Sequence, residues 1–520
     1  MLKNINFIKG MSFLLFASFV SLNAVADEAI TQDAEVNTLA IEEIIVTARK
    51  KEESIQDVPM AVTAITEQLR ESSVRRIEDI QAFAPNLFIN RTPGIASGAA
   101  ITIRGVASLE SDKSYEPSIG VVMDGMFLGT SSGVLLDNFD IERIEVLRGP
   151  QGTLFGKNTT GGILNVIRTP VSLNEFGADV SLTVGDFGRQ DVKAVVQVPI
   201  IEDTLGIKLF AASIEHDGHV YNTFLDTPAG GDDKKNYGFA LLWEPNENLS
   251  IKLHHEIMED KSEQGVYVNR NRVGELACTI TQIGFTPYNG CEKDANDGPD
   301  TTESDGTNFS DNEYESTIIT ANYDTENFLY TYIYSLRDMD EQNMQDFDGS
   351  RANLLRMNFF NDWEQTSHEF RVTSQFSEKF QFIAGVYDWE ADFAQRWNVY
   401  DLFYQLSRLG VPPWPSGRIG VEGYDDVVTW EDDVAGNNGQ TQVTESIAVF
   451  ASVDWFVTDQ WTITAGFRWT EEEKDFVGGA SAPGYYPLRG EPWPGIFNPK
   501  AFKAKWDETT PKIGVRYQPS

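Results

Sequence analysis

The sequence predicts a transmembrane antiparallel β-barrel that follows a small N-terminal α+β domain. Three observations carry this prediction. Long segments have an apolar stripe with a period of two, short and long connections alternate strictly between these segments, and the region before them has a mixed helix and strand pattern. The chain has 520 residues, too many for one ordinary compact domain, so at least two units are expected.

The first residues have the composition of a cleavable export signal. Lys3 and Lys9 form a basic start, and the apolar run Met11–Leu22 has the length of a signal core. Small residues at 24–26 provide a cleavage site, so we predict a signal peptide at 1–26. No later segment has the ~20 apolar residues that a membrane helix needs. A membrane-embedded form of this chain therefore has to be a barrel, which satisfies its backbone groups within the sheet.

The next residues, 27–51, are predicted to be an arm outside the folded domains, on the periplasmic side if the chain is a membrane barrel. Residues 27 to 41 are acidic and lack a pattern, as in a flexible arm. The segment Glu43, Ile44, Ile45, Val46, Thr47 and Ala48 is rich in β-branched residues and has no partner strand nearby.

Residues 52–170 have the pattern of a small α+β domain. Thr66 and Ser73 can each cap a short helix, and the second helix is expected to end before Pro85. Four strands are expected, at Ala100–Arg104, Ser118–Met123, Ile144–Leu147 and Ile163–Ile167.

From 175 to 520 the pattern is that of long membrane strands. Trp461, Ile463, Ala465, Phe467 and Trp469 alternate with polar or small residues. Eight steps of ~3.3 Å make this stripe roughly 26 Å long, which matches the ~25 Å lipid-facing band of an outer-membrane barrel. Tryptophan at both ends is typical of aromatic girdles. A soluble β-sandwich also alternates, but its strands cluster near about 5–6 residues.

The connections between these strands alternate in length. Short turns are expected near 199–205, 244–248, 323–327, 375–379 and 456–460, and long polar connections near 215–235, 259–314, 337–365, 389–443 and 471–507. Outer-membrane barrels have this asymmetry, with short periplasmic turns and long extracellular loops. The sequence contains about twelve such strands.

Composition excludes several classes of function. A net charge of −38 argues against nucleic acid as a partner, because phosphate binding needs basic patches. Cys278 and Cys291 lie in one polar stretch and are candidates for a local disulfide, with two free or metal-binding thiols as the alternative. The five histidines do not form a metal-ligand set, and no nucleophile–base grouping indicates an enzyme, so we predict neither a metal site nor a cofactor.

The stretch Ile141–Pro170 is the most informative motif. It carries five glycines after Arg148 between two β-type segments. A phosphate loop, G-x-x-x-x-G-K-[ST], is the closest chemical alternative, but the spacing does not fit. Gly152 is one residue too close to Gly156-Lys157, and Asn158 stands where the hydroxyl should be.

Over its full length this stretch resembles the end of the plug domain of TonB-dependent outer-membrane receptors. Ile101–Gly105 and Val121–Gly125 also resemble the family pattern, and the resemblance covers essentially all of the chain. It implies a plug inside a barrel of about 22 strands. Because about twelve strands are present and Ser520 is not the usual terminal aromatic residue, we expect an incomplete barrel at 175–520, with a closed twelve-stranded barrel as the alternative.

The resemblance also implies functional residues. Glu43–Ala48 resembles the TonB box, which could add as a strand to a partner sheet; an ordinary first plug strand is the alternative. Charges such as Arg104, Arg143, Glu145 and Arg148 pair, in the family, within the plug or with carboxylates of the barrel wall, which implies gating or simply structural ion pairs. Positions expected to serve tight turns and close backbone approach are Gly105, Asp124, Gly125, Gly149, Pro150, Gly152, Gly156, Gly161 and Gly162.

The function implied by the resemblance is energy-coupled import across the outer membrane of a Gram-negative bacterium. The cargo would be a scarce ligand, most often a ferric siderophore or other iron complex, and it would enter when TonB and its inner-membrane complex pull the plug. Cobalamin or a glycan is the alternative cargo, and a non-transporting outer-membrane binding protein is the alternative function. The expected partners are TonB, a small-molecule ligand such as a ferric chelate, and outer-membrane lipid.

Overall fold

The computed structural model describes residues 44–66, 69, 74–92, 95–107, 112–134, 139–268, 300–306, 308–351, 355–377, 379–401, 434–481 and 496–518. Ile44–Ser520 form one compact unit. The predicted signal peptide, the acidic arm, Glu43 and the two cysteines, Cys278 and Cys291, lie outside the described residues.

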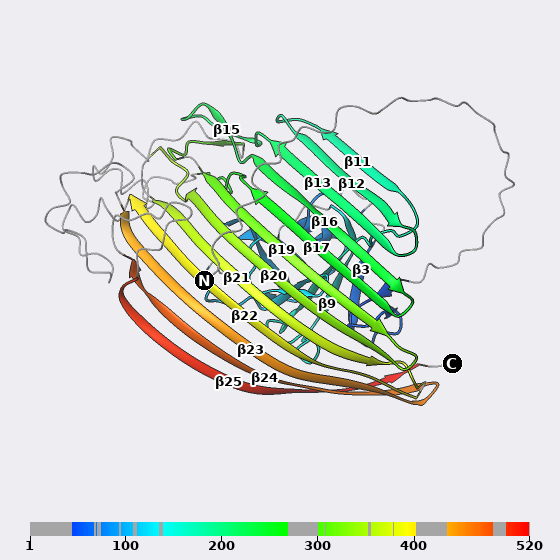
Figure 1. Ribbon diagram of the computed structural model, residues 1–520. Helices are drawn as coiled ribbons and strands as arrows, with labels where there is room; N and C mark the ends of the chain where they lie inside the picture. The colour runs from blue at the N-terminus through cyan, green and yellow to red at the C-terminus, as the bar shows by residue number, and fades with distance from the viewer. Residues whose placement is uncertain are drawn as a thin grey trace, which may run out of the picture. The chain divides into compact units, whose positions relative to one another are not determined.

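A twelve-stranded antiparallel sheet makes up most of the described chain (Figure 1). Each strand pairs with the neighbours that precede and follow it in the sheet order. The strands are β11 (Gly177–Val184), β12 (Gln190–Ile201), β13 (Leu205–His216), β16 (Asp232–Asn246), β17 (Leu249–Asp260), β19 (Phe309–Asp324), β20 (Phe328–Asp346), β21 (Leu355–Ser374), β22 (Phe380–Asp401), β23 (Val434–Thr458), β24 (Trp461–Ser481) and β25 (Ile496–Tyr517). The expectation of about twelve antiparallel strands is confirmed.

All five predicted short turns join consecutive strands at one end of the sheet, which we call the short-turn end. The long connections at the other end were predicted too long. Strand β20 continues to Asp346 and β21 begins at Leu355, inside the connection expected at 337–365. These strands keep their hydrogen-bond ladder in a region where both faces are polar. The alternation of apolar residues stops before the strand ends, so it placed the start of the connection too early. Three short strands, β14 (Val220–Asn222), β15 (Thr227–Ala229) and β18 (Thr301–Thr302), form a separate sheet within the long connections.

The predicted apolar stripe faces outward. Trp461 and Phe467 are 44% and 47% exposed, whereas Thr462 and Thr464, between them in sequence, are 8% and 6% exposed. Exposed apolar side chains follow the same alternation on strands inside the sheet such as β13 and β23, which is the lipid-facing pattern of a membrane barrel. No helix in the described part of the chain is long and apolar enough to cross a membrane.

The N-terminal domain contains a five-stranded sheet in the order β3-β9-β10-β7-β8 and a three-stranded sheet in the order β4-β5-β6. Only the β10–β7 pair is parallel among the pairs described in these two sheets. The strands are β3 (Ala61–Ile65), β4 (Leu87–Thr92), β5 (Ile95–Ile103), β6 (Val106–Ala107), β7 (Ile119–Met123), β8 (Met126–Leu128), β9 (Ile141–Arg148) and β10 (Gly162–Arg168). All four predicted strands are present, and β3, β4, β6 and β8 are additional.

The second predicted helix is shorter than expected and begins later. It is a single 3₁₀ helix, η1 (Ile77–Ala82), and Ser73, the predicted cap, lies outside the described residues. The Asp79 carboxylate accepts hydrogen bonds from the backbone N–H groups of Arg75 and Arg76 at 2.9 and 3.0 Å. The side chain that binds the free N–H groups therefore comes from the first turn of the helix. A search for a capping residue before the helix does not find it.

The turn at Asp124-Gly125 was predicted correctly. It joins β7 to β8, with Met123 paired to Met126, and both turn residues have positive φ, 47° and 92°. This is the conformation of a two-residue type I′ hairpin, which favours Asp-Gly.

An arginine in the apolar stripe should destabilise the barrel. We expect Ala465→Arg, in the middle of the stripe, to lower the free energy of unfolding from lipid bilayers by about 2–4 kcal/mol, because the charge lies near the bilayer midplane. The matched control is Val477→Arg, which replaces an apolar residue on the same face of β24 beyond the apolar stripe and should change stability little. Urea titrations in vesicles measure both, and equal losses would contradict the assignment of this face to lipid.

Candidate functional site

The segment that resembles the TonB box is paired in this structure. Strand β1 (Ile45–Val46) pairs with β2 (Glu53–Ser54), forming a hairpin that we call the β1–β2 hairpin. Ile45 is 41% exposed, whereas Val46 and Ala48 are fully buried. The expectation of a segment without a nearby partner strand was wrong, because each strand has only two residues and gives no periodic signal.

A buried carboxylate in the plug holds this hairpin. Glu145 Oε1 accepts hydrogen bonds from the Thr47 backbone N–H at 2.8 Å and from Arg143 Nε at 2.9 Å. Its Oε2 accepts one from Asn165 Nδ2 at 3.0 Å. Because Glu145 is fully buried, these donors compensate a charge that would otherwise be costly there.

Three consecutive cations after the segment reach the inner wall of the barrel. Arg49 and Lys51 both pair with Asp454 of β23, at 2.8 and 3.3 Å. Lys50 pairs with Glu369 of β21 at 2.5 Å. The β1–β2 hairpin is therefore bound on one side to the plug and on the other to the barrel wall.

Lys50 lies close to two aromatic rings. Its Nζ lies 5.3 Å from the ring centre of Phe155 and 5.1 Å from that of Phe450. Burial lowers the pKa of Lys50 to about 8, and the neighbouring Glu369 carboxylate opposes this shift only in part. The ammonium group has lost much of its hydration in this position, which disfavours its charged form.

Further ion pairs connect the plug to the wall away from the hairpin. In many of them the plug supplies the cation and the wall the carboxylate, and these pairs include Arg76–Asp232, Arg168–Glu256, Lys113–Glu341 and Lys157–Glu472. Others have the opposite polarity, including Asp140–Lys208 and Glu116–Lys474. Sequence reasoning missed these residues, because a charge in a sequence does not reveal whether it faces another element.

The four plug charges predicted to gate form two different kinds of contact. Arg143 and Glu145 pair with each other inside the plug. Arg104 is exposed on the β5–β6 turn, and Arg148 donates a hydrogen bond to the Thr63 hydroxyl. Neither arginine forms an ion pair with any described residue, so carboxylate partners for these two stay a prediction. Burial, together with the nearby Arg104, lowers the pKa of Arg148.

The predicted structural glycines divide into three groups. Gly105, Gly125, Gly149, Gly156 and Gly162 have positive φ. Gly161 has no positive φ, but a Cβ there would lie 2.3 Å from Ile119 Cδ1, so close packing requires glycine. Gly152 meets neither condition, since its nearest contact to an added Cβ would be 3.4 Å. Pro150 lies in the same β9–β10 connection.

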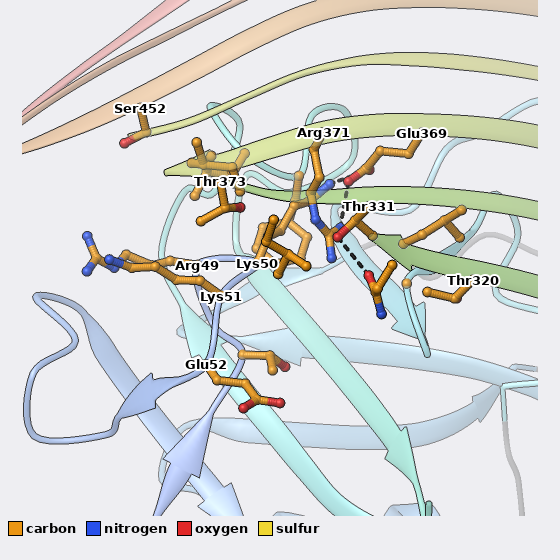
Figure 2. A pocket seen from close by; sticks show the side chains of 18 of the residues that line it. Arg49, Lys50, Lys51, Glu52, Thr320, Thr331, Glu369, Arg371, Thr373 and Ser452 are labelled. Atoms are coloured by element: carbon orange, nitrogen blue, oxygen red, sulfur yellow. Dashed lines mark hydrogen bonds and ion pairs between the residues drawn. The ribbon is translucent and has the colours of Figure 1, made fainter. Parts of the chain in front are cut away.

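A cavity of about 850 Å³ lies between the plug and the wall at the short-turn end. Figure 2 shows plug residues Arg49–Glu52 on one side of it and wall residues Glu369, Arg371 and Thr373 on the other. The anchored β1–β2 hairpin thus forms part of the boundary of this cavity.

Comparison with known families identifies the chain. The profile of the TonB-dependent receptor plug domain matches residues 54–163, and that of the TonB-dependent receptor-like β-barrel matches residues 266–520. The chain belongs to the TonB-dependent receptors.

Several relatives of this receptor carry names that indicate transport or uptake. It is 28% identical over 153 residues to the vitamin B12 transporter BtuB of Vibrio vulnificus, covering 28% of this chain and 24% of that protein. It is 23% identical over 256 residues to the ferrioxamine receptor of Yersinia enterocolitica, covering 47% and 34%. The crystal structure of the ferric yersiniabactin uptake receptor FyuA from Yersinia pestis has a TM-score of 0.68 at 16% identity, covering 89% of this chain and 62% of that one. The chain therefore spans less than two thirds of the length of these relatives.

Docking of the β1–β2 hairpin should strengthen as pH rises from 7 to 10. Lys50 has a pKa of about 8 when docked, below its ordinary value of 10.5, so the undocked state binds more protons between these values. A higher pH therefore favours the docked state. If the Lys50–Glu369 salt bridge alone held the hairpin, docking would instead weaken as Lys50 lost its proton.

The measurement is a ratio of two rates of labelling by a thiol reagent. The rate for a Val46→Cys reporter, which is buried when the hairpin is docked, is divided by the rate for an exposed Ile45→Cys reporter. This ratio should fall with pH in the native receptor and stay constant in a Lys50→Met background. A ratio that rises with pH would show that the ion pair, not burial, dominates.

Proposed function

We propose that this receptor imports a scarce ligand across the outer membrane of a Gram-negative bacterium, driven by TonB. Family membership and the plug-and-wall fold support this function. Relatives named as a transporter or as receptors for small ligands support import over any role as an enzyme.

The observation that carries the proposal is the double attachment of the β1–β2 hairpin. Ile44 and Ile45 are exposed, at 36% and 41%, and offer a strand edge to a partner protein. Directly after them, Thr47 is bound to the plug through Glu145, and Lys50 is bound to the wall through Glu369. A force applied at the exposed edge acts on these attachments before it reaches the plug sheet.

Ion pairs of this kind suit a seal that must open under force. A buried pair is only weakly stabilising overall, because desolvation offsets much of the attraction. Breaking a pair in the presence of water restores hydration to both partners. Apolar wall side chains such as Met258, Ile333 and Trp389 also pack against the plug core, so the ion pairs act together with an apolar contact.

The cargo we favour is a ferric siderophore or another iron complex. A ferrioxamine receptor is among the relatives, and FyuA shares the fold. Cobalamin is the second candidate, because a vitamin B12 transporter is similar over a segment about as long as the plug.

Substituting proline into the exposed edge should uncouple the receptor. We expect Ile45→Pro to abolish disulfide or chemical cross-linking between this segment and TonB, because proline removes a backbone donor from the added strand. The amount of receptor in the outer membrane should not change. Ile45→Ala, which keeps the backbone donor, should retain the cross-link, and loss in both variants would mean that the contact depends on the side chain.

The iron assignment is tested by expression. The receptor should increase in outer-membrane fractions of cultures treated with an iron chelator, as measured by immunoblot against iron-replete cultures. An increase under cobalamin limitation instead, with no response to iron, would favour the second candidate. A receptor that binds at the cell surface but supports no uptake in either condition would be a binding protein.

A further inference from the structure

The cavity at the short-turn end has the size of a ligand site. Its volume of about 850 Å³ lies within the range of roughly 300–1,000 Å³ found for small-molecule pockets. It is bounded by the plug on one side and by strands from β17 to β23 on the other. It lies away from the long-connection end, where a ligand from outside would first meet the receptor.

Each cation that lines the cavity lies next to a carboxylate. Lys50 and Arg371 both pair with Glu369, and Lys252 lies 3.9 Å from Asp124. Arg49 and Lys51 pair with Asp454. Every described cation of the lining therefore already has a carboxylate partner, which weakens its attraction for an anionic ligand.

Uncharged polar groups of the cavity are mostly hydroxyls and amides. The hydroxyls of Thr320, Thr373 and Ser452 line the cavity and have no hydrogen-bond partner among the described residues. Figure 2 shows Thr320, Thr373 and Ser452 on barrel strands around the plug residues Arg49–Glu52. These groups can donate to the oxygen atoms of a passing molecule.

A tight contact between plug and wall lies next to the cavity, towards the other end of the barrel. Gln365 of β21 accepts a hydrogen bond from Gly129 N–H at 3.0 Å and donates one to the Phe127 carbonyl at 2.6 Å. A Cβ on Gly129 would lie 2.7 Å from atoms of both Trp363 and Trp389, so the plug backbone is pressed against the wall here. We call this contact the Gln365 seam.

We propose that the cavity is an inner station on the cargo route, where a compact, oxygen-rich molecule resides after crossing the Gln365 seam. The inference rests on the proposed import function. It specifies that the cargo passes between the plug and strands β17 to β23 of the wall. Cations already paired with carboxylates and separate hydroxyl donors give weak binding at several points, which lets a molecule enter and also leave.

The test is access of a thiol reagent from outside the cell. Thr373→Cys and Thr320→Cys are placed singly in a receptor whose Cys278 and Cys291 are replaced by serine. Cells that lack general porins are treated with a sulfonated fluorescent maleimide, with and without an uncoupler. Thr462→Cys is the control, because Thr462 of β24 also faces inward at the short-turn end but does not line the cavity.

We expect the Thr373→Cys and Thr320→Cys receptors to be labelled several-fold faster in energised than in uncoupled cells, with no such difference for the control. Equal labelling of all three variants would overturn the station but leave the import function standing. The same holds if neither cavity variant is labelled while the Ile45 segment still cross-links to TonB. Loss of the TonB cross-link in the same cells would overturn both.

Discussion

The packing of this receptor depends on the neutralisation of charge between the plug and the inner wall of the barrel. A barrel interior that carries Asp454, Glu369, Glu256 and Glu341 cannot enclose an apolar domain without a large desolvation penalty. The plug provides a cation for each of these carboxylates, at Arg49, Lys50, Arg168 and Lys113. Position and orientation of the plug are consequently set by charge matching as much as by its own core.

The same matching connects the fold to the proposed mechanism. The cations nearest to the exposed edge are consecutive in sequence and follow directly after the segment that we propose TonB binds. Glu145 binds Thr47 from the plug side and Glu369 binds Lys50 from the wall side. The hairpin is therefore the point where a small displacement would disturb both attachments and change the boundary of the adjacent cavity.

Much of the architecture could be predicted from local patterns. Lipid imposes a period of two on each membrane strand, so Trp461 to Trp469 revealed its outward face without any structure. Asp124-Gly125 revealed a type I′ turn, because few other residue pairs adopt two positive φ angles. Local patterns failed where the signal was too short or too indirect. The two-residue strand β1 has no period, and the cap of η1 comes from Asp79 within the helix.

The sequence by itself determined the membrane-barrel class, the strand faces, the short turns and the resemblance of the plug motifs, because each depends on residues close together in the chain. Only the tertiary structure decided which charges meet across the interface. Arg49 and Asp454 lie 405 positions apart, and Lys50 and Glu369 lie 319 apart. Arg104 and Arg148 have the same charge and lie within the family motifs, yet their side chains find no carboxylate among the described residues. Pairing depends on the direction of a side chain and on the wall that it faces, and both arise only when distant strands assemble around the plug.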